Sequence, residues 1–302
     1  MENFRSNSKK DIQITQLNPG GDRQDGIHIA RESLSLDFSP ENQEKIRQKS
    51  IVVDLCSSVE ENKPSLELAL KQKPPLILTG SELTFSQKEE DKKAKPEMSD
   101  YYRRAELYTL RAIGYARRYG GRVLGVCFGF QSIAKELFST NNKSCVQPLN
   151  QWVAGESLID IDDSWEGIIK PGKYQIRLSL KDAVIRKSWS PSNELGIENI
   201  SNEFMEVKVL GEGPEVILPS TGENVSLVMG YRVKFKKSGG EILALAGHPE
   251  LPMSMLNQVI KQRSSDSRFN MPLNLLKLDD EDRKNSMQSI EIVSSFLSNN
   301  ES

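Results

Sequence analysis

The stretch RVLGVCFGFQSIAKEL, residues 122–137, contains the pattern that decides the fold. An apolar run, RVLGVC, leads directly into FGFQSIAKEL, whose composition and spacing favour a helix. Gly125 and Gly129 flank Cys127, so the sequence has the G-x-nucleophile-x-G form of a nucleophile elbow. The pattern predicts a buried strand, a sharp turn that carries Cys127, and a helix.

The residues around Cys127 suit a reactive thiol. Gly125 and Gly129 leave room for a turn at which larger side chains would collide with the strand or the helix. A cysteine at the start of a helix lies near free backbone N–H groups and the positive end of the helix dipole. Both lower the thiol pKa, and the N–H groups can also hold a developing oxyanion. We expect Cys127 to be a nucleophile, and the alternative is a buried structural cysteine.

A second motif, AGHPE at residues 246–250, follows the apolar run ILAL. The chain has only two histidines, His28 and His248, and only His248 lies at the end of a predicted strand. Its imidazole can take a proton from a thiol and later give one to a departing amine. Glu250, two residues further on, can orient the ring. The alternative for so short a motif is a surface histidine beside a surface glutamate.

The rest of the chain predicts an α/β fold. Alternating apolar and polar residues predict an isolated first strand at 12–17. Continuous apolar runs predict strands at 50–55 and 76–80, of the kind that is buried on both faces of a parallel sheet. A helix is predicted at 101–119, with an apolar stripe made of Leu107, Leu110, Ile113 and Gly114. Beyond residue 140, QWVAGESLIDI, KYQIRLSL, EVKVL, VSLVM and YRVKFK read as strands, and a closing helix is expected at 280–297. We therefore predict a mostly parallel central sheet flanked by helices, with additional antiparallel strands in the second half.

Domain organisation follows from the same patterns. We expect a single domain over residues 1–302, with a polar N-terminal segment at 1–11 and an insertion at 165–222 whose role the sequence does not indicate. The mixed charges of SQKEEDKKAKP, residues 86–96, predict an exposed connector.

Composition excludes several classes of function. The 40 basic and 42 acidic residues give a net charge of -2, which favours neither nucleic acid nor an anionic membrane as a partner. No apolar run approaches the roughly 18 residues that span a bilayer, and the N-terminus lacks a secretory signal. The three cysteines have no CxxC spacing, so they predict no disulfide framework and no metal site. We expect a soluble, cytoplasmic protein without a cofactor.

Taken in this order, GVCFGFQ and GHPE resemble the class I glutamine amidotransferase family, whose elbow reads G-x-C-x-G-x-Q and whose other catalytic pair lies in an H-P-E. The resemblance implies a flavodoxin-like α/β fold and a Cys-His-Glu triad, as in a GMP-synthase-like amidotransferase domain. It makes Cys127 the nucleophile, His248 the general base and acid, and Glu250 the orienting carboxylate.

A third match is LILTGSELT, residues 76–84, which is similar to the family's apolar strand and its Ser-Gly-Gly-Pro-like loop. By this resemblance the backbone N–H groups of Ser81 and Phe128 form the oxyanion hole. Gly80 and Gln131 become substrate-binding positions, although a packing role is equally open for Gln131.

The sequence also departs from the family pattern. Ser81 and Glu82 replace the second glycine and the proline of the family loop, and Phe130 stands where histidine or methionine is common. No histidine lies between Cys127 and His248, where many members have one that shapes the glutamine site.

The resemblance implies hydrolysis of the glutamine side-chain amide through a Cys127 thioester. The chain has no GxxxxGK[ST] P-loop, so the ammonia is expected to pass to a separate synthetase partner. Two alternatives stay open: a stand-alone γ-glutamyl hydrolase or peptidase of the same fold, and a non-catalytic relative that binds or regulates.

Overall fold

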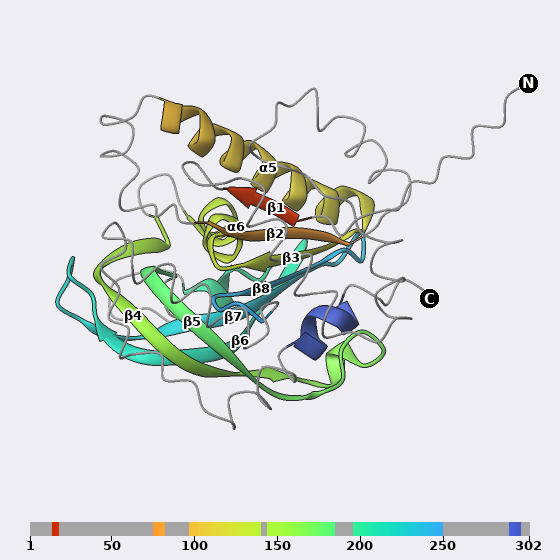
Figure 1. The fold of residues 1–302 in the computed structure, drawn as a ribbon. Coiled ribbons are helices and arrows are strands. Elements are labelled where there is room, and N and C mark those ends of the chain that lie inside the picture. Colours follow the sequence, from red (N-terminus) through yellow and green to blue (C-terminus); the bar gives the residue numbers. More distant parts are fainter. Residues whose placement is uncertain are drawn as a thin grey trace, which may run out of the picture.

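The elbow stretch folds as a strand, a tight turn and a helix (Figure 1). Strand β3, Arg122–Val126, is separated by one residue from helix α6, Phe128–Phe138. The computed structural model describes residues 14–17, 75–81, 97–139, 144–184, 196–249 and 290–296. The strand predicted at 50–55, the connector at 86–96, Glu250 and most of the closing helix lie outside these residues.

Strand β3 lies inside a six-stranded sheet of order β1-β2-β3-β8-β7-β6. Strands β1 (Ile14–Leu17), β2 (Leu76–Ser81), β3 and β8 (Glu241–Leu245) run parallel to one another. Strands β7 (Asn224–Phe235) and β6 (Met205–Ile217) extend the sheet in the antiparallel sense. The predicted α/β class, with parallel strands and added antiparallel strands from the second half, is confirmed.

Strand β7 contains two segments that the sequence predicts as separate strands, VSLVM and YRVKFK. Gly230 lies between them and continues the ladder opposite Leu245 of β8. A Cβ at this position would lie only 2.9 Å from Ile159 Cδ1. The glycine therefore marks a close approach of β4 to the sheet rather than a turn.

A second, two-stranded sheet is formed by β4 (Val146–Ile161) and β5 (Gly172–Val184), which pair antiparallel. This long ribbon lies alongside β6 and β7 (Figure 1). Strands β5 and β6, together with the short helix η2 (Ile197–Ile200), fall within residues 165–222. That range therefore contributes one strand to each sheet.

Helix α5, Glu97–Tyr119, packs against α6 and against strands β2, β3 and β8. The predicted apolar stripe is wrong in part, because Leu110 is 48% exposed. The buried face consists mainly of alanines and tyrosines: Tyr102, Ala105, Tyr108, Thr109, Ala112, Ile113, Tyr115 and Ala116. At Ala116 the helix lies very close to the start of β8, because a Cβ on Gly240, the residue before that strand, would be 2.0 Å from the carbonyl oxygen of Ala116. Among the described helices, none is both long and apolar enough to cross a membrane.

A buried charged cluster lies at the opposite end of the sheet from the elbow, where β3 and β8 begin. Arg232 on β7 donates to Glu241 Oε1 at 2.6 Å, and its guanidinium lies 4.4 Å from the centre of the Trp165 ring. Trp165, in the short helix η1 (Asp163–Trp165), packs in turn on Phe296, with ring centres 5.7 Å apart. The cluster therefore joins η1 and the helical residues 290–296 to the sheet.

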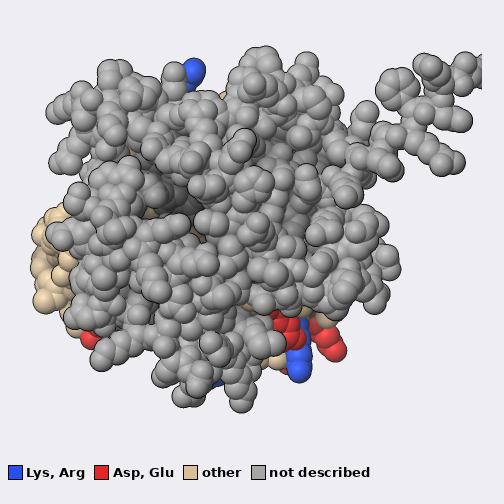
Figure 2. All heavy atoms as spheres, in the orientation of Figure 1, with Lys and Arg blue, Asp and Glu red and all other residues tan. Residues whose placement is uncertain are grey.

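Described charged side chains at the molecular surface are mixed in sign. At the lower right edge of the face in Figure 2, acidic and basic side chains lie next to one another. The exposed arginines of α5, at positions 103, 111, 117 and 118, form the solvated side of that helix.

Candidate active site

Cys127 occupies the turn between β3 and α6 with a backbone conformation that is rare for a non-glycine residue. Its φ is 53° and its ψ is −108°. Among the described residues, Asn150 is the only other non-glycine residue with a positive φ. Such a conformation costs about 1–3 kcal/mol and persists only where the surrounding structure enforces it. Two backbone hydrogen bonds hold it: Cys127 N–H donates to Leu245 O at 2.9 Å, and Gln131 N–H donates to Cys127 O at 3.1 Å.

The two flanking glycines are required by contacts that the sequence does not reveal. A Cβ on Gly129 would lie 2.2 Å from the carbonyl oxygen of Leu78, in β2. A Cβ on Gly125 would lie 2.6 Å from Ile133 Cδ1 and 3.1 Å from the carbonyl oxygen of Gly129. Glycine at these positions therefore lets the first turn of α6 pack directly on β2 and β3.

His248 follows the strand next to the one that ends at Cys127. Strands β3 and β8 pair in parallel up to Val126 opposite Leu245, and His248 lies three residues beyond that pair. It is partly exposed, between buried Gly247 and Pro249. The structure thus brings the thiol-bearing turn and the histidine-bearing loop to the same edge of the sheet.

The end of β2 reaches the same edge on the other side of β3. The parallel register pairs Leu78 with Gly125, two residues before Cys127, and β2 continues to Ser81. In parallel α/β sheets, ligands bind at the carboxyl ends of the strands. Cys127 lies in the middle of this edge, between the ends of β2 and β8.

Gln131 has a contact inside the protein. Its side chain is only 5% exposed, and its Nε2 donates to the backbone carbonyl of Asp182 in β5 at 3.1 Å. This hydrogen bond supports the packing role that the sequence left open. Asp182 is also a residue that the sequence did not indicate, because a backbone acceptor carries no side-chain signature.

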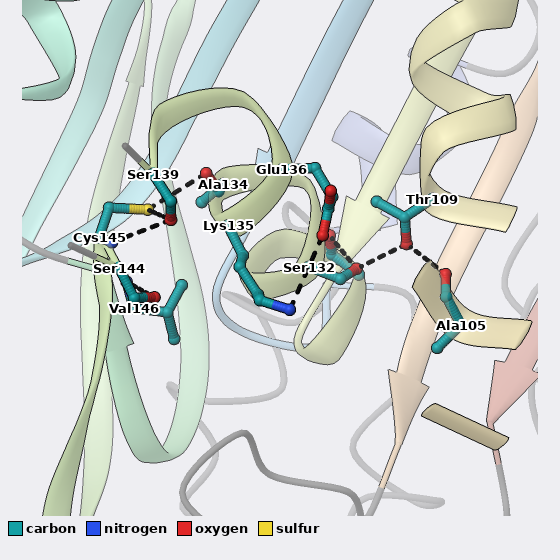
Figure 3. Close-up of polar contacts among 11 residues, drawn as sticks. Ala105, Thr109, Ser132, Ala134, Lys135, Glu136, Ser139, Ser144, Cys145 and Val146 are labelled. Atoms are coloured by element: carbon teal, nitrogen blue, oxygen red, sulfur yellow. Dashed lines mark hydrogen bonds and ion pairs between the residues drawn. The ribbon is translucent and has the colours of Figure 1, made fainter. Parts of the chain in front are cut away.

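The first turn of α6 is also connected to α5 by hydroxyl groups (Figure 3). Thr109 Oγ1 lies 3.2 Å from Ser132 Oγ, which donates to the carbonyl of Gly129 at 3.2 Å. Thr109 Oγ1 also donates to the carbonyl of Ala105, at 2.7 Å. These buried contacts link the second glycine of the elbow to the neighbouring helix.

Cys145 offers an internal comparison for the Cys127 thiol. Its thiol is buried and donates to the carbonyl of Ala134 at 3.1 Å, near Ser139 (Figure 3). Burial raises its pKa to about 12, outweighing the hydrogen bond from Ser139 and the charge of Lys135. Cys127 is partly exposed.

We expect iodoacetamide at pH 8 to alkylate Cys127 and to leave Cys145 unmodified. With a pKa raised to about 12, Cys145 holds only about one thiolate in ten thousand at that pH, and the thiolate is the reactive form. Peptide mapping by mass spectrometry of the folded protein measures both sites at once. Unfolding in urea before alkylation is the control, since it should expose Cys145. Modification of Cys145 in the folded protein, at a rate matching Cys127, would contradict the burial.

No metal cluster is found in the described part of the chain: no group of three or more His, Cys, Asp or Glu side chains there could hold an ion.

Comparison with known proteins identifies the fold. No protein-family model matches the chain, and no curated protein matches it by sequence. Among solved structures, a glutamine amidotransferase from Thermotoga maritima is similar, with a TM-score of 0.52 and 12% identity over 95% of this chain and 96% of that one. The glutaminase domain of Trypanosoma brucei CTPS, with bound acivicin, matches with a TM-score of 0.48 and 12% identity over 94% and 93%. The chain has the fold of the Thermotoga amidotransferase.

Proposed function

We propose that the chain hydrolyses the side-chain amide of glutamine, or of a related γ-glutamyl compound, with Cys127 as the nucleophile. The observation that carries the proposal is the conformation of Cys127: a strained cysteine on a strand-turn-helix elbow, at the carboxyl edge of a parallel sheet, beside the loop of His248. We also propose that the chain is a member of the class I glutamine amidotransferase family. In this proposal residues 1–302 form a single domain with the flavodoxin-like arrangement of that family.

In the proposed reaction, His248 takes the Cys127 proton and the thiolate attacks the amide carbon. The carbonyl electrons move to oxygen, and the N–H groups of Ser81 and Phe128 stabilise that oxyanion. As the carbonyl re-forms, the C–N bond breaks, and the imidazolium of His248 protonates the departing nitrogen, which leaves as ammonia. Water, deprotonated by His248, then hydrolyses the thioester and releases glutamate and the thiol. Glu250 orients the imidazole.

Two kinds of enzyme fit this proposal. An amidotransferase would pass the ammonia to a separate synthetase partner, in keeping with the lack of a P-loop sequence in this chain. A γ-glutamyl hydrolase or peptidase would act alone. The lack of a histidine between Cys127 and His248, where many amidotransferases have one that shapes the glutamine site, is the reason to test this alternative. A reducing, cytoplasmic location would keep the Cys127 thiol reduced in either case.

The test compares substrates on the purified protein. We expect ammonia release from L-glutamine, or cleavage of γ-glutamyl peptides, and we expect a Cys127→Ala variant to lack both activities. A glutamine-mimicking diazo ketone should modify the peptide that contains Cys127, and its mass should rise by that of one bound inhibitor. Activity on γ-glutamyl peptides alone would favour the hydrolase. A folded protein that shows neither turnover nor labelling would refute the proposal and favour a non-catalytic relative.

A further inference from the structure

Tyr231 is a buried tyrosine that the proposed reaction does not use. It lies on β7 with 0% of its surface exposed. Its ring packs against Phe130 and Phe138 of α6, with ring centres 5.2 and 5.3 Å apart. Its hydroxyl donates to the backbone carbonyl of Phe130 at 2.7 Å. A strand side chain therefore reaches the first turn of the helix that follows Cys127.

The carbonyl that Tyr231 binds is one peptide group away from the nucleophile. It belongs to the peptide between Phe130 and Gln131, and the N–H of that same peptide donates to the carbonyl of Cys127 at 3.1 Å. A peptide group is planar and stiff, so a force on its oxygen is transmitted to its N–H. Hydrogen bonds that share a peptide group also polarise one another. The Tyr231 hydroxyl thus acts on the backbone of Cys127 through a single rigid unit.

The other side of the Cys127 backbone is held by the neighbouring strand. Cys127 N–H donates to Leu245 O at 2.9 Å, and Leu245 pairs with Gly230, the residue before Tyr231. Two adjacent strands, β7 and β8, therefore hold the two sides of a residue whose φ is 53°. A strained conformation of this kind is kept only where several contacts enforce it together.

We propose that Tyr231 is a positioning residue, whose hydroxyl holds the Cys127 backbone in its positive-φ conformation and so keeps the thiol aimed at its substrate. The inference rests on the proposed function, because aim matters only for a nucleophile. In a regular α-helix the Phe130 carbonyl also accepts the Ala134 N–H, so losing the Tyr231 hydroxyl does not leave this carbonyl without a donor. Removing the hydroxyl leaves the ring contacts in place.

The test is a Tyr231→Phe variant. We expect the second-order rate constant for alkylation of Cys127 by iodoacetamide to fall about threefold to tenfold, the range that one lost hydrogen bond corresponds to. For glutamine or the γ-glutamyl peptide that proves active, kcat should fall by a similar factor with KM unchanged. Both rates are measured well below the thermal unfolding transition, so that a change in stability alone does not affect them.

Tyr174→Phe is the matched control. Tyr174 on β5 is also buried, and its hydroxyl also donates to a backbone carbonyl, that of Lys170 at 2.6 Å, but α6 is not involved. This variant loses the same kind of hydrogen bond, and we expect wild-type alkylation and kcat from it.

The outcomes separate the inference from the proposed function. If the wild-type protein turns over substrate and Tyr231→Phe is alkylated and turns over substrate at the same rates, the positioning role is overturned and the proposed function stands. An equal loss of rate in Tyr174→Phe would also overturn the positioning role. A folded wild-type protein with neither turnover nor diazo-ketone labelling would overturn the proposed function, and the positioning role with it.

Discussion

Replacing Cys127 with serine is expected to lower the turnover of glutamine or of γ-glutamyl substrate at least about a thousandfold. Serine has nearly the same size and can occupy the same turn, so the hydrogen bonds to Leu245 and Gln131 are kept. Its hydroxyl is far less acidic than a thiol, and a neutral imidazole at His248 leaves it almost entirely protonated. The measurement is kcat at saturating substrate, with circular dichroism to show that the fold is retained.

Cys145→Ser is the control for this variant. Cys145 donates to the carbonyl of Ala134, seven residues after Cys127 in the chain, and we expect wild-type turnover from the variant. If Cys127→Ser kept substantial turnover, or if Cys145→Ser lost it, the assignment of the nucleophile would be wrong.

Gly129→Ala is expected to lower the free energy of unfolding by about 3 kcal/mol. The new Cβ would lie 2.2 Å from the carbonyl oxygen of Leu78, 2.8 Å from its carbonyl carbon and 2.9 Å from its Cβ. Two of these atoms are backbone, so no rotation of a side chain relieves the overlap, and α6 must move away from β2. The movement would also displace Cys127, so alkylation by iodoacetamide should slow in parallel. Urea denaturation measures the change in stability.

Gly114→Ala makes the same substitution in α5 and is expected to have the opposite effect. Nothing lies within 4 Å of a Cβ at Gly114. Alanine is favoured over glycine inside a helix by about 1 kcal/mol, so this variant should be slightly more stable than wild type. Equal stability of Gly129→Ala and Gly114→Ala would show that the contact with Leu78 does not constrain the elbow.

The elbow could be predicted from the sequence because its signal is local. An apolar run, a cysteine between two glycines and a helical segment specify strand, turn and helix through the backbone preferences of residues close in the chain. The same holds for β8, whose five residues are all buried and whose end precedes His248. The α/β class followed from these elements, since continuous apolar runs suit parallel strands covered on both faces.

Where the local signal was misleading, close packing was the reason. Leu110 was placed on the buried stripe of α5 because it is apolar, but the helix buries its alanines and tyrosines against the sheet. VSLVM and YRVKFK are predicted as separate strands, but they form one strand in which Gly230 makes room for Ile159. The spacing of apolar residues along the sequence predicts which face of a helix or strand is buried. The distance between packed elements decides which side chains fit on that face.

The sequence by itself thus determined the turn at Cys127, the strand that leads to His248, and the class of the fold. Only the tertiary structure decided which strands are neighbours, and therefore that the ends of β2 and β8 flank Cys127. It also decided that Gly129 meets Leu78 and that Tyr231 binds the carbonyl of Phe130, 101 residues away in the chain. Such contacts depend on the order and packing of whole elements, and no pattern within one segment encodes them.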